Sequence, residues 1–261
     1  MRDLTKLAIL AALRAGEAIL PLYGERIETS VKLDGSPLTE ADKRSHRIII
    51  ETLSDSGIPV VSEEGESLFP DAGRYWLVDP LDGTKEFLAR IEEFTVNIAL
   101  VEEGYPVLGV LFAPALDELY AGEQGSGAWK ERNGETLPCL PSARVDSFRM
   151  TVSRFHDHPD LEIFAAENGV RRRIEAGSAL KYARLATGEA DVFPRLVGCS
   201  EWDTAAGQAV LEAAGGSVLD WNTGERLGYG KERRRNPRLI SFRAPYRLSD
   251  FALQTYEREL L

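Results

Sequence analysis

Cysteine is scarce in this sequence, and long apolar runs are absent. The chain of 261 residues has two cysteines, Cys139 and Cys199, and neither has the C-x-x-C or histidine spacing of a zinc site. The longest apolar stretch, residues 106–116, is about half the ~20 residues that a membrane helix needs. No signal peptide is recognised at its start. We therefore expect no disulfide framework, no integral membrane segment and a cytoplasmic location.

Positive charge is also in deficit. The sequence has 31 Lys and Arg against 42 Asp and Glu, which gives a formal net charge of −11 at pH 7. This balance disfavours binding to a nucleic acid polymer or to an anionic membrane surface. The one basic run, residues 231–235, is short, and we interpret it as a solvated loop.

Several catalytic motifs are missing as well. With 3 histidines in the whole chain, a Ser-His-Asp hydrolase has weak support. The G-x-x-x-x-G-K-[ST] phosphate loop does not occur. Asp79 and Asp82 are too far apart for the D-x-D motif of a haloacid-dehalogenase phosphatase, and Leu81 breaks an EF-hand pattern. Residues 139–144 are one residue short of the C-x5-R loop of a tyrosine phosphatase.

What is present is a regular succession of hydrophobic patterns. Apolar residues at helical spacing predict helices over about 4–22 and 39–56. Short strands are predicted at 59–62 and 74–79. The second strand should end at Asp79, because a residue before proline is extended and the chain then turns.

The remaining sequence divides into two kinds of pattern. Residues 94–129 have the composition and alternation of β-strands, and Asn133-Gly134 is typical of a further hairpin. After about residue 145, strands and helices alternate, as in a layered α/β structure. This change predicts a mixed-sheet half over residues 1–145 and a smaller α/β half over 146–261. Its helices are expected near 159–168, 178–187 and 203–214.

Acidic residues stand beside the predicted strand and helix ends. Each place has a purely structural explanation: Thr39-x-x-Asp42 fits a capping box, Asp203 fits a helix N-cap and Asp82-Gly83 fits an ordinary turn. Taken singly, these explanations are favoured. The acidic positions are Asp42, Glu63, Glu64, Asp79, Asp82, Glu201 and Asp203.

Taken together, the acidic residues favour a metal site. Asp79 and Asp82 flank a tight turn in which the Leu81 carbonyl is a third oxygen, and oxygen ligands suit Mg²⁺. Asp79 could bridge two ions while Asp82 reaches one. Glu63 and Asp203 would then complete the two shells, with the ions about 3.5 to 4 Å apart.

Three separated motifs carry a resemblance to a known family. The segments "SEEGE", "WLVDPLDGTKEF" and "EWDTAAGQAVLEAAGG" together resemble the inositol monophosphatase superfamily, in its 3'(2'),5'-bisphosphate nucleotidase branch of the CysQ type. The likeness extends from the first helix to about residue 240. Glu86 stands where the inositol phosphatases tend to have Asn, which favours the nucleotidase branch. "SPLTEAD", "VSRFH" and "GSALKYARLATGEAD" point the same way.

The resemblance implies a fold, an activity and a cofactor. The fold is a five-layered αβαβα sandwich. The activity is Mg²⁺-dependent removal of the 3'-phosphate from adenosine 3',5'-bisphosphate, or from its sulfated relative, by water. Two to three Mg²⁺ ions per site are expected, with inhibition by Li⁺ or Ca²⁺. The ligands carried over are Glu63, Asp79, the Leu81 carbonyl, Asp82 and Asp203.

Further residues are assigned by the same resemblance. Thr84 would help to hold the attacking water and the phosphate, Asp42 would act through a third metal's water or as a proton acceptor, and Glu64 would support the ligand Glu63. The catalytic set is therefore Asp42, Glu63, Glu64 and Thr84. Substrate contacts are expected from Gly83, Thr84, Lys85, Ser153, His156, Ser178, Lys181 and Asp203.

Other possibilities stay open at this point. The same metal core could serve an inositol monophosphatase or a fructose-1,6-bisphosphatase-like sugar phosphatase, or the chain could be a metal-dependent nucleotide sensor. Relatives include dimers, so a homodimer is a further possibility. Residues 244–261 extend past the resemblance and are predicted to form an amphipathic helix with Phe251, Leu253, Tyr256 and Leu260 roughly on one face. We expect this helix to pack on its own chain rather than on another subunit.

Overall fold

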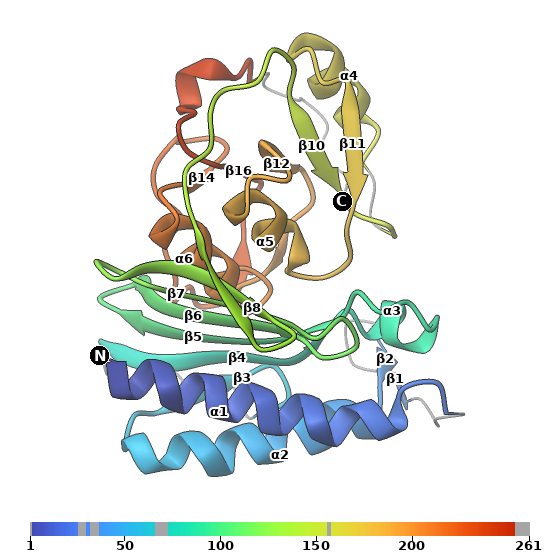
Figure 1. Ribbon diagram of the computed structural model, residues 1–261, viewed down its shortest axis with the longest axis vertical. Coiled ribbons are helices and arrows are strands. Elements are labelled where there is room, and N and C mark those ends of the chain that lie inside the picture. The colour runs from blue at the N-terminus through green and yellow to red at the C-terminus, as the bar shows by residue number, and fades with distance from the viewer. Residues whose placement is uncertain (1, 26–29, 32–36, 66–72, 156–157, 254–261) are drawn as a thin grey trace.

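Helices and sheets stack in five layers (Figure 1). The computed structural model describes residues 2–25, 30–31, 37–65, 73–155 and 158–253. From bottom to top in Figure 1, the layers are a helix pair, a seven-stranded sheet, a second helix pair, a five-stranded sheet and an outer helix. The αβαβα architecture expected from the resemblance is confirmed.

The first layer consists of α1 (Arg2–Ile19) and α2 (Glu40–Leu53), which pack on one face of the large sheet. Both helices are continued by a 3-10 turn, η1 (Leu20–Leu22) and η2 (Ser54–Ser56). The two helices predicted from the sequence are therefore confirmed. No helix in the described ranges is long and apolar enough to cross a bilayer.

The seven-stranded sheet follows the order of the sequence. Its strands pair antiparallel, except that the first two are parallel. Asn133 and Gly134 both have positive φ, 50° and 75°, and connect the last two strands as a hairpin, as predicted. The strands are β3 (Val60–Ser62), β4 (Arg74–Asp82), β5 (Thr95–Glu102), β6 (Tyr105–Ala113), β7 (Glu118–Glu123), β8 (Gly127–Arg132) and β9 (Glu135–Cys139).

Both faces of this sheet are covered by helices. Along β5, Ile98 and Leu100 pack with α1 and α2, whereas Ala99 and Val101 belong to the cluster on the other face. Successive side chains of a strand point to opposite faces, so a strand covered on both sides must be apolar at every position. This explains why the central strands read as continuous apolar runs.

The second helix pair, α5 (Leu180–Ala186) and α6 (Ala205–Ala213), lies between the two sheets. Glycines on the large sheet let the α6 backbone approach it closely. A Cβ on Gly109 would lie 2.3 Å from the carbonyl oxygen of Ala206, and one on Gly122 would lie 2.6 Å from the Cα of Val210. These contacts leave no room for a side chain at either position.

We expect Gly109→Ala to destabilise the protein, because the new methyl group would overlap the α6 backbone and force the helix away from the sheet. Overpacking of this kind costs about 2 kcal/mol, which lowers the Tm of a chain of this size by about 5 °C. Gly228→Ala is the matched control, since its nearest neighbour lies 3.7 Å away. Thermal melts with equal Tm values for the two variants would contradict the prediction.

The C-terminal half contributes the five-stranded sheet, in the order β11-β10-β12-β16-β14. Its outer face is covered by α4 (Asp160–Glu167), whose Leu161 and Phe164 are buried against it. The strands are β10 (Arg149–Val152), β11 (Arg172–Glu175), β12 (Val192–Arg195), β14 (Ser217–Asp220) and β16 (Leu239–Phe242). Two shorter pairs are β1 (Ser30–Val31) with β2 (Pro37–Leu38), and β13 (Cys199–Ser200) with β15 (Arg235–Asn236).

The predicted boundary at residue 145 falls in the connection between β9 and β10. The two halves share one hydrophobic cluster, in which Leu111 and Tyr120 of the large sheet pack with Tyr182 of α5 and Val210 of α6. Their division into two domains therefore stays a prediction.

The prediction of a helix over residues 244–261 is wrong for the described part, residues 244–253. There the chain forms the 3-10 turn η3 (Leu248–Asp250), and Asp250 accepts a hydrogen bond from the Arg247 backbone. Phe251 is extended and buried, with its ring 4.9 Å from Phe148 and 5.3 Å from Phe242. Phe251 thus packs against aromatic rings of its own chain, and the backbone there is extended instead of helical. Tyr256 and Leu260 lie outside the described residues.

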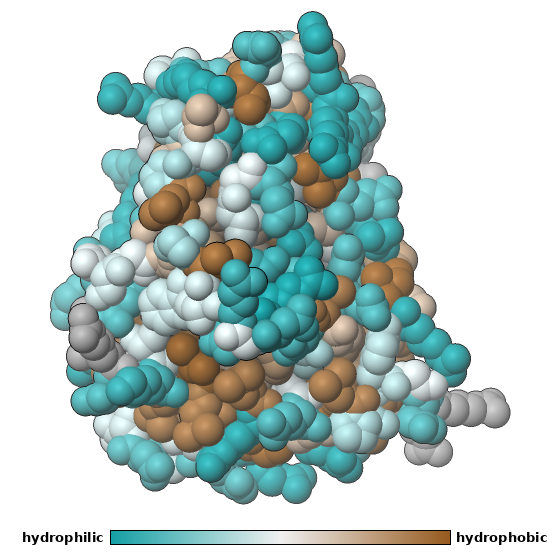
Figure 2. Space-filling view, in the orientation of Figure 1, coloured by the Kyte–Doolittle hydropathy of each residue, from teal (hydrophilic) through white to brown (hydrophobic). Residues whose placement is uncertain are grey.

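Apolar surface gathers over the lower part of the face seen in Figure 2, where α1 and the large sheet lie. Leu10, Leu13 and Leu20 are 41%, 36% and 37% exposed. A patch of this kind is compatible with a homodimer, which stays a prediction.

Candidate active site

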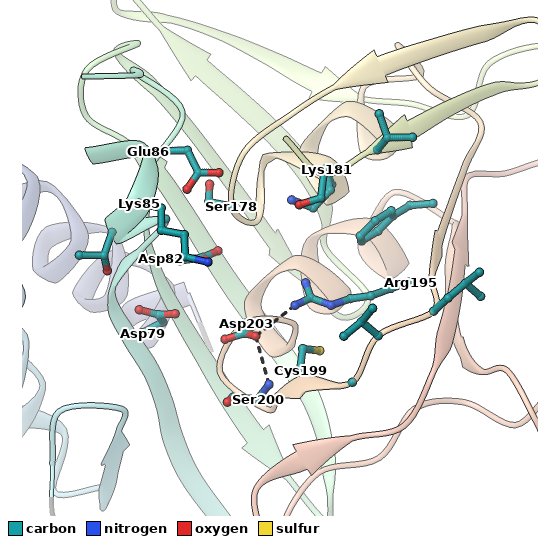
Figure 3. A pocket seen from close by; sticks show the side chains of 18 of the residues that line it. Asp79, Asp82, Lys85, Glu86, Ser178, Lys181, Arg195, Cys199, Ser200 and Asp203 are labelled. Carbon is teal, nitrogen blue, oxygen red and sulfur yellow. Dashed lines mark hydrogen bonds and ion pairs between the residues drawn. The ribbon is translucent and has the colours of Figure 1, made fainter. Parts of the chain in front are cut away.

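A cavity of about 450 Å³ opens between the two halves of the chain. Figure 3 shows Asp79 and Asp82 on one side of it and Asp203 on the other. The first two come from the end of β4, and Asp203 comes from the segment between β13 and α6. Glu63, which follows β3, also lines the cavity. The fold therefore brings together all the carboxylates that the sequence predicted as metal ligands.

A bulge at the end of β4 turns Asp79 and Asp82 to the same side. Asp79 pairs with Asn97 and Asp82 pairs with Thr95, so three steps along β4 match two steps along β5. In a regular strand, residues three apart point to opposite faces, and one extra residue reverses this parity. The strand assigned to β4 thus continues to Asp82, and its predicted end at Asp79 is wrong, although the regular pairing does break there.

The carboxylates at this end of the cavity are poorly compensated by positive charge. Asp79 is 2% exposed and accepts a hydrogen bond from the Leu81 backbone at 3.1 Å. Burial, with the charges of Glu63, Asp82 and Asp203, raises the pKa of Asp79 well above its usual range. Burial and the charge of Asp203 raise the pKa of Asp82 to about 7, although Asn97 donates a hydrogen bond to it at 3.1 Å.

Asp203 is held by hydrogen bonds from Ser200 and Arg195, and not by the N-terminus of a helix. Its Oδ2 accepts hydrogen bonds from the Ser200 backbone at 3.1 Å and from Arg195 Nη2 at 3.5 Å, drawn as dashed lines in Figure 3. Within the described chain, the N-cap of α6 is Thr204, which makes no side-chain capping bond. The N-cap explanation of Asp203 is therefore wrong. Burial raises the pKa of Asp203, and the charge of Arg195 opposes that shift.

Asp42 forms the capping box that the sequence predicted, and it also contacts Thr84 at the cavity. Its Oδ2 accepts a hydrogen bond from the Thr39 backbone at 2.8 Å, and the Thr39 side chain accepts one from the Asp42 backbone, which is the predicted capping box of α2. The Thr39 hydroxyl also donates to Oδ2, at 2.6 Å. Its Oδ1 accepts one from the Thr84 hydroxyl at 3.3 Å, and that hydroxyl lies 3.3 Å from the Leu81 carbonyl oxygen. Asp42 is thus coupled to the cavity through Thr84.

Most of the predicted substrate residues line the cavity. These are Gly83, Thr84, Lys85, Ser153, Ser178, Lys181 and Asp203. The described residues that line it do not include Asp42 or Glu64, whose direct participation stays a prediction. His156 lies outside the described residues. The neighbouring His158 lines the cavity, with its Nδ1 accepting a hydrogen bond from the Asp160 backbone at 3.2 Å.

The loop before α5 is hydrogen-bonded to the start of β5 and to the residue Glu93 just before it. Glu93 accepts hydrogen bonds from the Gly177 backbone and from Arg154, each at 2.9 Å, and Thr95 donates one to Ser178 at 3.2 Å. Ser178 has a φ of 46°, which is uncommon for a residue other than glycine. These bonds hold it beside the acidic end of the cavity.

Lys181 on α5 brings a buried cation to the same cavity. Its side chain is 3% exposed and donates a hydrogen bond to the Ala176 carbonyl at 3.1 Å. Burial and the nearby charge of Arg195 lower the pKa of Lys181 to about 8.

The structure adds residues that the sequence did not single out. Arg195 at the end of β12 and Arg235 on β15 are cationic, and an apolar wall faces the same space. An arginine at a strand end has no distinctive sequence pattern, and scattered apolar residues are typical of a hydrophobic core. The sequence therefore gives no signal that these residues line a cavity. The apolar wall is formed by Val152, Leu161, Phe193, Leu196 and Val197.

The interpretation of residues 231–235 as a solvated loop is right for Glu232 and Arg233, which are exposed, and wrong for the residues that bind a buried carboxylate. Lys231 and Arg234 pair with Glu201, which is fully buried, at 3.2 and 3.4 Å. Arg235 lines the cavity. The basic run is held in place because a buried carboxylate requires cationic partners.

The acidic end of the cavity has the chemistry of a site for a hard divalent cation. Among the described residues, no three His, Cys, Asp or Glu side chains already form a group that could hold a metal ion. The donor set is nevertheless all oxygen and anionic, and the pKa values of Asp79 and Asp82 are raised because burial and the neighbouring carboxylates leave their charges without sufficient compensation. A divalent cation would provide that compensation. Glu63, Asp79, Asp82 and Asp203 therefore fit Mg²⁺.

Five alternating layers, with acidic side chains from both halves at one end of a shared cavity, define the class of layered phosphatases that act on small phosphate esters. The chain belongs to the inositol monophosphatase family, whose model matches residues 1–241. Members of this family are metal-dependent phosphatases that generally use Mg²⁺.

Individual relatives are similar over most of their length. The 3'(2'),5'-bisphosphate nucleotidase CysQ of Salmonella typhimurium is 43% identical over 226 residues, which cover 84% of this chain and 90% of the relative. The crystal structure of CysQ from Bacteroides thetaiotaomicron is 37% identical and matches with a TM-score of 0.84, covering 94% of this chain and 98% of that one. An inositol-1-monophosphatase from Mesorhizobium japonicum is 33% identical over 244 residues, 86% of this chain and 88% of the relative.

Proposed function

We propose that this protein is a Mg²⁺-dependent phosphomonoesterase that converts adenosine 3',5'-bisphosphate to AMP and phosphate. The observation that carries the proposal is one cavity with a carboxylate-rich end and an apolar wall. The similarity to nucleotidases named CysQ supports the nucleotide as substrate. The 5'-phosphosulfate form of the substrate would fit the same description.

Glu63, Asp79, Asp82, Asp203 and the Leu81 carbonyl would hold two to three Mg²⁺ ions. When bound, Mg²⁺ would activate the attacking water and stabilise the leaving ribose oxygen. The carboxylates contribute four formal negative charges, from Glu63, Asp79, Asp82 and Asp203. Without cations they would repel a phosphate ester, so the acidic end is suited to substrate only when it is loaded.

Thr84 and Asp42 would position the attacking water. The Thr84 hydroxyl lies 3.3 Å from both Asp42 Oδ1 and the Leu81 carbonyl oxygen, so it can donate its proton to either and accept a hydrogen bond from water. The capping box fixes the Asp42 carboxylate through its other oxygen. This arrangement orients the water at Thr84 Oγ1 before the reaction begins, which lowers the entropic part of the barrier.

The apolar wall distinguishes a nucleotide from a sugar phosphate. Phe193 and Leu196 are 3% and 4% exposed, so Val197, which is 46% exposed, presents most of the apolar surface that a base could cover. A purine base that covers such a wall removes apolar surface from water, worth roughly 25 cal/mol per Å². Inositol and fructose carry hydroxyl groups on every side and would lose hydration there without gaining a partner.

Phosphate release from three substrates at saturating Mg²⁺ tests the proposal. We expect kcat/KM for adenosine 3',5'-bisphosphate to exceed that for inositol 1-phosphate and fructose 1,6-bisphosphate by at least about 10-fold. Of the three substrates, only the nucleotide has an aromatic base that can cover the apolar wall. The Asp79→Asn variant, prepared in the same way, controls for contaminating phosphatases. Equal or faster release from inositol 1-phosphate would identify an inositol phosphatase instead. Tight nucleotide binding without any phosphate release would identify a sensor.

Other expectations from the sequence stay predictions. They are the cytoplasmic location, the homodimer, and inhibition by Li⁺ or Ca²⁺. Ca²⁺ prefers more ligands and longer bonds than Mg²⁺, so it would hold the attacking water in the wrong position.

A further inference from the structure

From the hydrogen bonds between α2 and the ends of β3 and β4 we infer that Ser45 and His46 are positioning residues, which hold the proposed metal ligands of these two strands in place. The inference rests on the proposed function, because it concerns side chains proposed to bind Mg²⁺. Neither Ser45 nor His46 is among the described residues that line the cavity, so both would act through the residues that they contact.

The bulge at the end of β4 takes two buried carbonyl groups out of the strand ladder. The register shift between Asp79 and Asp82 leaves Pro80 and Leu81 without a paired residue on β5. A buried carbonyl without a hydrogen bond is costly in free energy, so each of the two requires a partner from another element. The Leu81 carbonyl, itself a proposed metal ligand, accepts a hydrogen bond from Thr84 at 3.3 Å.

Ser45 on α2 supplies the partner for Pro80. Its hydroxyl donates a hydrogen bond to the Pro80 carbonyl at 2.6 Å, and Ser45 is 0% exposed. The same peptide group carries the N–H of Leu81, which donates to Asp79 Oδ1 at 3.1 Å. Because a peptide group is planar, Ser45 on one side and the Asp79 carboxylate on the other hold one rigid unit. The bond from Ser45 therefore orients the carboxylate of Asp79.

His46, the next residue along α2, holds the end of β3. Its Nδ1 is hydrogen-bonded to the Ser62 hydroxyl at 2.9 Å. Ser62 is buried, is the last residue of β3 and directly precedes Glu63. The Glu63 backbone donates a hydrogen bond to the Val78 carbonyl of β4 at 3.1 Å. The proposed ligand Glu63 is thus tied to β4 by its own backbone and to α2 through the neighbouring serine.

One face of α2 therefore contacts both strand ends. Asp42, Ser45 and His46 are three and four positions apart, which places them side by side on a helix. The helix is a firm base, because its capping box fixes the first turn and Ile49 is buried in the core under the large sheet. Partners that hold metal ligands from behind keep the ligands in the geometry that the ion requires, and their loss typically weakens metal binding 10- to 100-fold.

Calorimetric titration of the full chain with Mg²⁺ alone tests the inference without turnover. We expect Ser45→Ala to raise the Kd for Mg²⁺ about 10- to 100-fold, because the Pro80 carbonyl loses its partner and the turn that carries Asp79 loosens. Ser45→Thr keeps a hydroxyl donor and should stay within about threefold of the wild type. His46→Phe keeps a ring but loses the bond to Ser62, and should raise the Kd about 10-fold. His46 is partly exposed, so this variant tests the inference independently of the buried Ser45.

Ser56→Ala is the matched control for a general loss of stability. At the far end of α2, the Ser56 hydroxyl donates to the Leu53 carbonyl at 2.6 Å and accepts a hydrogen bond from the Trp76 indole at 3.0 Å. This variant should lower the Tm, as Ser45→Ala does, and leave the Kd for Mg²⁺ unchanged. An unchanged Kd in Ser45→Ala or in His46→Phe would overturn the role of that residue, and an equal rise in Ser56→Ala would overturn both. Failure of the wild-type protein to bind Mg²⁺ or to release phosphate from the bisphosphate would instead refute the proposed function.

Discussion

Replacing Asp82 with Asn should lower kcat for phosphate release by about 10³-fold while the protein stays folded. The amide has the shape of the carboxylate but lacks its charge, so it binds Mg²⁺ poorly. Asn97 can still donate its hydrogen bond to the oxygen of the new side chain, because that bond needs only an acceptor. Phosphate release at saturating Mg²⁺ measures the effect. Wild-type turnover in the variant would remove Asp82 from the proposed metal site.

The same substitution should not destabilise the Mg²⁺-free protein. Burial and Asp203 raise the pKa of Asp82 to about 7 in the folded state, whereas the unfolded value is about 3.9. Between these values the folded state holds more protons than the unfolded state, so the free energy of unfolding falls as pH rises from about 4 to 7. The Asp82→Asn side chain does not titrate, so the variant avoids this loss of stability. The Tm of the variant at pH 7 should equal or exceed that of the wild type.

Thermal melts without Mg²⁺ test the stability prediction. Asp146→Asn is a suitable control, because Asp146 is exposed and lies outside the cavity. A Tm about 10 °C below the wild type would assign Asp82 a structural role and contradict its assignment as a metal ligand.

The largest stability effect should come from Asp191, which is 0% exposed. Its carboxylate accepts hydrogen bonds from the Arg149 backbone, Nε and Nη2 at 2.7 to 2.9 Å, and from Arg243 Nε at 2.7 Å. Arg243 is 3% exposed, so Asp191→Ala would leave a buried cation without its partner. Breaking a buried pair in this way costs about 3–5 kcal/mol, which lowers Tm by about 10 °C or more.

The pH dependence follows from the same contacts. Burial alone would raise the pKa of Asp191, but the hydrogen bonds from Arg149 and the charge of Arg243 outweigh it and lower the pKa below its usual value. Asp191 therefore contributes its stability above the unfolded pKa of about 3.9 and loses it as the pH falls further. The variant should lack this loss at acidic pH.

Glu162→Gln is the matched control for Asp191→Ala. Glu162 pairs with Arg173, and the two side chains are 70% and 41% exposed. Exposed ion pairs contribute about 0–1 kcal/mol, so its Tm should change by less than about 3 °C. Similar Tm losses in both variants, measured at pH 7, would contradict the difference between a buried and an exposed pair.

The sequence alone determined the motifs and much of the local structure. Helices α1 and α2 follow from apolar residues at helical spacing, and the capping box follows from Thr39 and Asp42, because these features depend on neighbours within a few residues. Asp79 and Asp82 stand in a motif whose residue types and order already indicated a cation site. The resemblance of three such motifs also predicted the five layers.

Tertiary structure decided the contents of the cavity beyond those motifs. The bulge that aims Asp79 and Asp82 the same way depends on how β4 pairs with β5. The place of Arg235 depends on the pairing of β13 with β15 and on buried Glu201, and the apolar wall joins residues from β10, α4 and β12. None of these contacts has a local pattern, because they form between segments far apart in the chain and each residue type is common elsewhere. The sequence therefore indicated the carboxylates at the acidic end of the cavity, and only folding brought the arginines and the apolar wall to the same cavity.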